Sequence, residues 1–145
     1  MSHVVSIKTE LKDLRAVKEA CRELGLTFVE GRKTYAWYGA SVGDTALPEG
    51  ITREQLGHCE HVIQVPGAGY EIGLVKNPKT GGFRLLFDYW GPGKKIVDTL
   101  GGQGVPKLIQ AYGICKATIE AKARGYLVTR QPGKNGSVNL ILTQV

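Results

Sequence analysis

Two stretches of the chain repeat their apolar residues with the period of a helix. The first, residues 14–24, follows Asp13, a residue type that caps helices, and precedes Gly25, where a helix can end. Its apolar stripe consists of Leu14, Val17, Cys21 and Leu24. The second stretch begins at Pro106, which suits the first position of a helix, and runs to Gly125. Both patterns predict amphipathic helices that bury one face.

Other stretches alternate apolar and polar residues, as strands do. Residues 83–90 place Phe83, Leu85, Phe87 and Tyr89 on one face of such a strand. Turn-forming residues at 76–82, and the Asn135-Gly136 pair, join neighbouring strands into hairpins. The predicted strands are residues 4–8, 27–30, 33–38, 61–65, 70–75, 83–90, 126–131 and 137–143. Residues 27–30 and 33–38 flank Gly31-Arg32 and form either a hairpin or one bent strand.

This order of elements predicts an α+β fold. Strands joined by short turns pair antiparallel, so we expect an antiparallel sheet of about five to seven strands, with two main helices packed on one face. The length of 145 residues matches one domain, and no linker, repeat or low-complexity segment divides it. We therefore expect a single α+β domain over residues 1–145.

Glycine is about twice as frequent as usual, with 20 residues in the chain. Residues 39–57 are rich in turn-forming types and form the longest irregular segment, within which Thr52 predicts one helical turn at residues 51–56. Long loops in small domains often carry function. Two further glycine clusters, at residues 91–93 and 101–104, do not match phosphate-loop spacings, so we interpret them as turns and caps.

The charge and the cysteine content indicate which partners and which cellular compartment suit the protein. The net charge of +6 and the pI near 9.3 favour acidic partners, although the basic residues are scattered. Three widely spaced cysteines argue against a disulfide framework and for a reducing compartment. No signal-peptide pattern and no membrane-length apolar run are present, so we expect a cytoplasmic protein, or one in a compartment like the plastid stroma, without membrane contact.

The densest group of potential metal ligands is the stretch His58-Cys59-Glu60-His61. Imidazole and thiolate groups bind zinc, and His58 and His61 would share a face if this stretch were helical. However, His61 begins a predicted strand, and no second ligand pair completes a four-ligand site. The alternative is a turn that leads into a strand with Cys59 buried. Zinc on His58, Cys59 and His61 is therefore one hypothesis, and no cofactor is otherwise predicted.

Aromatic and basic residues form the other candidate site. Exposed rings flanked by cations can stack on bases or dock on proteins. The alternative is that the aromatic row of residues 83–89 is simply the core-facing side of a strand. The candidate binding residues are Tyr35, Trp37, Asp88, Trp90, Lys94 and Lys95.

Asp88 lies inside the most apolar strand and is the acidic residue of greatest interest. Strand alternation places it on the face opposite Phe87. If the Phe87 row is the core, we expect Asp88 to be partly exposed, with a lysine or arginine nearby. Replacement by asparagine would then barely change stability.

Several short motifs stand out along the chain: Met1-Ser2-His3, Ser6-Ile7-Lys8-Thr9, the stretch 14–24, Tyr70-Glu71-Ile72-Gly73, Phe87-Asp88-Tyr89-Trp90-Gly91 and Asn135-Gly136-Ser137-Val138. Together they resemble an uncharacterised protein family of cyanobacteria and algal plastids, with relatives in other bacteria. The resemblance covers nearly the whole chain and implies a stand-alone domain. It supplies no mechanism or site residue.

Three functional hypotheses follow from these patterns. The first is a small, non-catalytic binding or accessory module that docks on a protein partner, because no catalytic constellation of side chains is evident. The second is a nucleic-acid-binding module that uses basic and aromatic surface residues. The third is a metal-binding protein that uses residues 58–61.

Overall fold

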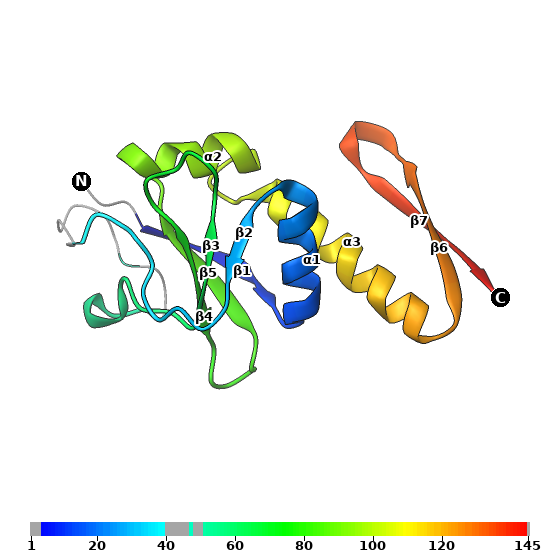
Figure 1. Ribbon diagram of the computed structural model, residues 1–145, viewed down its shortest axis with the longest axis horizontal. Coiled ribbons are helices and arrows are strands. Elements are labelled where there is room, and N and C mark those ends of the chain that lie inside the picture. The colour runs from blue at the N-terminus through cyan, green and yellow to red at the C-terminus, as the bar shows by residue number, and fades with distance from the viewer. Residues whose placement is uncertain (1–3, 40–46, 48–50, 145) are drawn as a thin grey trace.

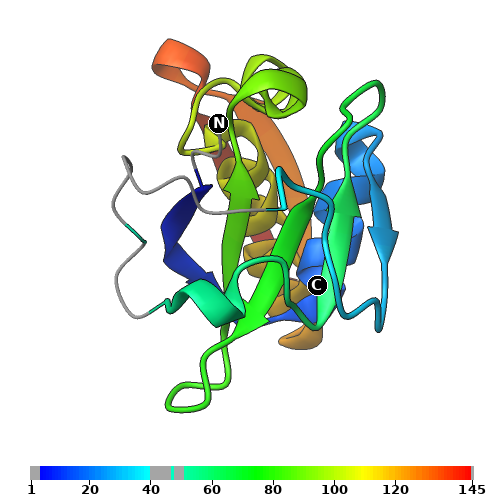
Figure 2. The ribbon, with the colours of Figure 1, turned by 90° about the vertical axis from the view of Figure 1, so that its left-hand side faces the viewer.

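The computed structural model describes residues 4–39, 47 and 51–144, and it has an α+β architecture (Figures 1 and 2). The described residues form three α-helices, which are α1 (Leu14–Leu24), α2 (Lys94–Leu100) and α3 (Pro106–Ala123). They also form seven strands, which are β1 (Val4–Leu11), β2 (Thr27–Val29), β3 (His61–Gln64), β4 (Ile72–Lys76), β5 (Phe83–Asp88), β6 (Tyr126–Pro132) and β7 (Val138–Gln144).

The first five strands form one antiparallel sheet in the order β1-β5-β4-β3-β2. β3, β4 and β5 follow one another along the chain, whereas β1 adds to the free edge of β5 and aligns Val4 with Asp88. The predicted antiparallel sheet is confirmed. Within the described residues, the last two strands pair only with each other, in a separate hairpin.

α1 begins and ends where the sequence predicts. The Asp13 carboxylate accepts a hydrogen bond from the backbone N–H of Arg15 at 2.9 Å, which satisfies a donor at the start of the helix. Gly25 ends it in the left-handed region, with φ of 72°, a conformation that glycine adopts without strain. Between them, α1 buries Ala16, Val17, Ala20 and Cys21.

The main hydrophobic core joins one face of the sheet to the helices. The sheet contributes Ile63, Ile72, Leu74, Leu85 and Phe87 to it, and side chains from α1, α2 and α3 complete the same buried cluster. The Tyr112 hydroxyl of α3 also accepts hydrogen bonds from the N–H groups of Lys12 and Asp13, at 2.9 and 3.1 Å. α2 was not predicted; it buries Ile96 and Leu100 beside the glycine-rich turns.

A second buried cluster covers the opposite face of the sheet. Its members are Tyr35, Ile51, Leu56, Cys59, Val62 and Leu86. The prediction of a strand at residues 33–38 is wrong: apart from one isolated bridge between Thr34 and His58, this segment runs over the sheet rather than within it. The predicted turn near Thr52 is present as a 3-10 turn at Arg53–Gln55, while residues 40–46 and 48–50 of the 39–57 loop lie outside the described residues.

The hairpin of β6 and β7 lies beyond α3, at the end of the molecule opposite α2 (Figure 1). Arg130 of β6 forms an ion pair with Glu23 of α1, and the Gln110 side chain of α3 donates to the Gly136 carbonyl at 2.8 Å. Among the described residues, no helix is long and apolar enough to cross a membrane.

We predict that Gly73→Ala lowers the free energy of unfolding by about 1–3 kcal/mol. An added Cβ would lie 2.3 Å from a ring carbon of Tyr35, which packs directly on this glycine. Gly113→Ala in α3 is the matched control, because its Cβ would meet nothing within 4 Å. That control should be neutral or stabilise by up to ~1 kcal/mol. Urea denaturation measures both, and equal stability of the two variants would contradict the packing described.

Candidate functional site

Asp88 is buried at the end of β5, with 0% of its surface exposed. The prediction of partial exposure is therefore wrong. Its face of the sheet is the predicted one, opposite Phe87, but the second hydrophobic cluster covers that face instead of solvent. The Asp88 carboxylate accepts hydrogen bonds from the backbone N–H groups of Tyr38 at 3.2 Å and Trp90 at 3.1 Å. These donors help to offset the loss of hydration.

Both of these backbone donors, Tyr38 and Trp90, belong to residues with exposed aromatic rings. Tyr38 is 49% exposed and Trp90 is 51% exposed. The Tyr70 ring lies beside the end of β5, since a Cβ on Gly93 would be 3.3 Å from Tyr70 Cδ2 and 1.7 Å from the Asp88 carbonyl oxygen. Burial first, and then the charge of Asp88, raises the pKa of Tyr70. We call Tyr38, Tyr70 and Trp90, grouped around Asp88, the aromatic end of the molecule.

Close backbone approaches fix the turns that present the aromatic end. Gly93 lies so near the Asp88 carbonyl that a Cβ there would be 1.7 Å from the oxygen. A Cβ on Gly69 would likewise be 2.8 Å from Pro92. Only glycine fits these two positions, so the turn before β4 and the turn after β5 are held together.

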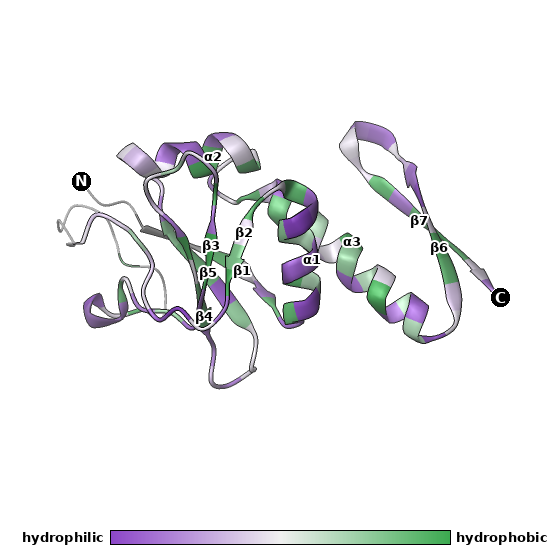
Figure 3. Cartoon of the chain, in the orientation of Figure 1, coloured by the Kyte–Doolittle hydropathy of each residue, from purple (hydrophilic) through white to green (hydrophobic). Residues whose placement is uncertain are grey.

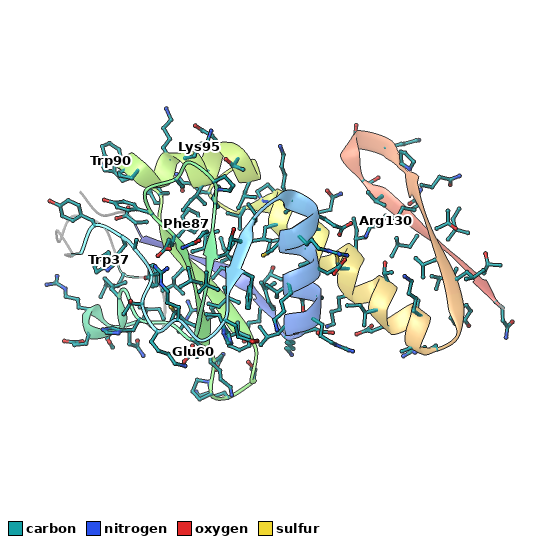
Figure 4. All side chains as sticks on the ribbon, viewed as in Figure 1. Trp37, Glu60, Phe87, Trp90, Lys95 and Arg130 are labelled. Carbon is teal, nitrogen blue, oxygen red and sulfur yellow. The ribbon has the colours of Figure 1, made fainter. Side chains whose placement is uncertain are left out.

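Two exposed lysines border the aromatic end. Lys94 and Lys95 begin α2, immediately after the 3-10 turn Gly91–Gly93 that follows Trp90. The Lys95 side chain reaches over Gly67, where a Cβ would lie 3.4 Å from its Cε. Figure 4 shows Lys95 and Trp90 on the same side of the molecule. Four predicted binding residues therefore follow one another within residues 88–95, with Asp88 buried and Trp90, Lys94 and Lys95 exposed.

The other two predicted binding residues serve the interior. Tyr35 is buried against Gly73, and burial raises the pKa of Tyr35 to about 12. Its hydroxyl has no hydrogen-bond partner among the described residues. Trp37 is half-buried, and its indole nitrogen lies 2.5 Å from where a Cβ on Gly57 would be. These rings pack on glycines and support the segment that carries Tyr38.

A second buried carboxylate, Glu71, escaped the sequence analysis. It pairs with Arg32 and accepts hydrogen bonds from the Ala36 N–H at 2.9 Å and the Gln64 side chain at 2.8 Å. These residues line an open hollow of about 420 Å³ beside Tyr70. Because its oxygens are engaged by protein donors, Glu71 acts as an anchor for residues 32–36. Strand alternation with Gly73 could have placed Glu71 on the covered face.

The residues of the predicted metal site point to separate partners. His58 is exposed, whereas the buried Cys59 thiol donates to the Arg32 carbonyl at 3.3 Å. The Glu60 carboxylate accepts from the Lys76 N–H at 2.7 Å. His61 accepts from the Gly31 N–H through Nδ1 at 2.9 Å, and its ring packs between Phe28 and Phe83. Within the described part of the chain, no group of three His, Cys, Asp or Glu side chains is placed to hold a metal ion.

Comparisons of the chain with family models, with curated proteins and with solved structures found no match. The resemblance to the cyanobacterial and plastid family therefore stays a prediction. Its opening motif, Met1-Ser2-His3, lies outside the described residues.

We predict that Asp88→Asn lowers the free energy of unfolding by about 1–3 kcal/mol. An amide group has only one acceptor oxygen, so one of the two backbone N–H groups now bonded to Asp88 would lose its acceptor. Asp98→Asn, at an exposed position of α2, is the control and should change stability by less than about 0.5 kcal/mol. Denaturant titration tests this, and two equally stable variants would show that Asp88 is not structurally required.

A pH-dependent prediction concerns His61. Burial lowers the pKa of His61 in the folded protein, with the nearby Glu30 carboxylate opposing this effect. The unfolded chain therefore binds the proton more readily, and the stability linked to neutral His61 is lost as the pH falls below about 6.5. We expect His61→Asn to flatten the acid side of the stability profile, and the matched variant His58→Asn to leave that slope in place. Thermal melts between neutral and mildly acidic pH measure both slopes.

Proposed function

We propose that this chain is a small, non-catalytic binding module that docks on a protein partner through its aromatic end. The observation that carries the proposal is the anchoring of two exposed aromatic residues, Tyr38 and Trp90, to a single buried carboxylate. Trp and Tyr supply much of the binding energy at protein interfaces. Exposed apolar side chains that gather in one region mark interaction surfaces.

The rigidity of this surface favours binding. Both rings belong to residues whose own backbone N–H groups donate to Asp88. Close contacts at Gly69 and Gly93 hold the neighbouring turns. A surface that is already ordered loses less conformational entropy when a partner docks. Lys94 and Lys95 beside it, together with the net charge of +6, favour a partner with an acidic rim.

The state of the nucleophilic and acidic side chains supports a non-catalytic role. Burial raises the pKa of Cys21 to about 12, and raises those of Cys59 and Cys115 to about 11, so their reactive thiolate forms are disfavoured. The buried carboxylates of Glu71 and Asp88 both bond to structural donors. Three free cysteines also suit a reducing compartment such as the cytoplasm.

The docking proposal predicts that Trp90→Ala weakens partner binding at least tenfold, the loss expected at an interface hot spot. Leu127→Ala removes an exposed apolar side chain at the other end of the molecule and is the control. Each variant is immobilised and challenged with nuclease-treated extract of the native host, and retained proteins are quantified by mass spectrometry. The expected pattern is a protein retained by the wild type and by Leu127→Ala but not by Trp90→Ala. If no protein shows this pattern, the proposal fails.

A nucleic-acid-binding module is the second candidate function, favoured by two exposed lysines, Lys94 and Lys95, that follow the exposed Trp90 after a single 3-10 turn. A tryptophan ring can stack on a base while lysines contact phosphates. This function predicts that labelled single-stranded RNA or DNA binds at low salt and dissociates steeply as salt rises. The Lys94→Gln, Lys95→Gln double variant should reduce the salt dependence. Absence of a mobility shift at micromolar protein would exclude this function.

A further inference from the structure

The hairpin of β6 and β7 carries several apolar residues (Figure 3), and some of their side chains are exposed. No residue of either strand is buried, and Leu127 and Ile141 are 59% and 41% exposed. A two-stranded hairpin by itself is marginally stable in water. Further strands paired at its edge would add the support that two strands alone lack.

One face of the hairpin is already anchored. Arg130, which pairs with Glu23 of α1, shares this face with the half-buried Val128 and Leu140. Leu142 lies on the same face and is 49% exposed. The outward face is unanchored and carries no charged residue; it consists of Leu127, Thr129, Gln131, Asn139, Ile141 and Thr143. The outward face therefore carries no charge that would repel a second sheet-forming strand placed beside the hairpin.

The two edges of the hairpin differ in how they resist pairing with another strand. The β6 edge contains Arg130 and Pro132, and charges and prolines are devices that protect sheet edges. β7 reads Val-Asn-Leu-Ile-Leu-Thr-Gln, with no charge, proline or glycine. A seven-residue uncharged strand with high β-propensity is an aggregation hazard unless something covers it. The β7 edge is therefore the one that requires a partner.

The backbone geometry shows which amide groups of β7 are free to pair. The Gly133 N–H donates to the Ser137 carbonyl at 2.8 Å, which makes this a hydrogen-bonded pair in the register of the hairpin. Bonded and non-bonded pairs alternate along an antiparallel ladder. Asn139, Ile141 and Thr143 consequently bond toward β6, while the backbone groups of Val138, Leu140, Leu142 and Gln144 point to the outer edge.

β7 reads almost the same in both directions from Ile141. A leucine stands on each side, at 140 and 142, and a polar residue stands next, Asn139 or Thr143. If two copies of β7 pair antiparallel about Ile141, leucine lies opposite leucine and asparagine lies opposite threonine. Leu140 and Leu142 both direct backbone groups outward, as a bonded pair requires. No like charges meet, although each chain carries +6.

We propose that the protein forms a two-fold symmetric dimer in which the β7 strands of two copies pair antiparallel, centred on Ile141, into one four-stranded sheet. Two-fold dimers are the commonest oligomers, and their interfaces are self-complementary, as the β7 sequence is. Main-chain hydrogen bonds between edge strands provide the association. This surface lies at the end of the molecule opposite Trp90, so its test is independent of the proposed docking function (Figure 4).

The first test is the mass of the full-length protein by sedimentation at micromolar concentrations. We expect twice the chain mass of 15.7 kDa. Ile141→Lys should shift the protein to monomer, because two lysines would face each other at the symmetry axis. Leu127→Lys places the same charge on the outward face of β6 and should remain a dimer. Circular dichroism confirms that both variants fold. A monomeric wild type, or a folded Ile141→Lys dimer, would overturn the proposal.

Cysteine crosslinking tests the register. The three native cysteines are free and buried, which leaves an introduced surface thiol as the reporter. Ile141→Cys should form a disulfide-linked dimer with diamide, since residues in a non-bonded antiparallel pair lie close enough to bridge. Asn139→Cys alone should not crosslink, but its mixture with Thr143→Cys should. Efficient crosslinking through Asn139→Cys alone would show a different register and overturn the pairing about Ile141.

Discussion

Two buried carboxylates hold residues 32–38 across the sheet, and the second face of the sheet depends on them. Backbone groups outside regular secondary structure still need partners when they are buried. Glu71 accepts from the Ala36 N–H, and Asp88 accepts from the Tyr38 N–H. With the segment fixed at these two points, Tyr35 packs on Gly73 and covers the sheet, and Tyr38 is left facing solvent. Packing on one side and exposure on the other therefore have a common origin.

Helix caps and strand alternation, which are read from neighbouring residues, correctly predicted the elements that depend on neighbouring residues alone. Asp13 and Gly25 define the ends of α1, and alternation in β5 places Phe87 on the core face, as the structure shows. Residues 33–38 also alternate and were predicted as a strand, but their surroundings are set by carboxylates that lie far along the chain. Alternation gives the spacing of side chains and does not say whether a segment lies within a sheet or over it.

The sequence identified several residues of the candidate site, but it did not predict how they are buried and held. Trp90, Lys94 and Lys95 are recognisable as exposed types close in sequence. The burial of Asp88 was missed because the cover comes from a segment about fifty positions earlier, which periodicity cannot detect. The stretch 58–61 shows the converse: Cys59 and His61 are neighbours in sequence, yet they belong to opposite faces of the sheet. Proximity along the chain did not bring their side chains together.

The order of the strands has a consequence for how the chain folds. β3, β4 and β5 are joined by short connections and can pair as each is made. β1, in contrast, is the edge strand of the described sheet and pairs with β5, so Val4 cannot pair before Asp88 has been synthesised. Closing so long a loop costs entropy before the contacts it forms offset that loss, which makes such pairings slow. During synthesis the first strand is therefore unpaired until most of the domain has emerged. A ribosome that stalls before residue 88 leaves an edge-forming strand without its partner, in a state prone to misassembly.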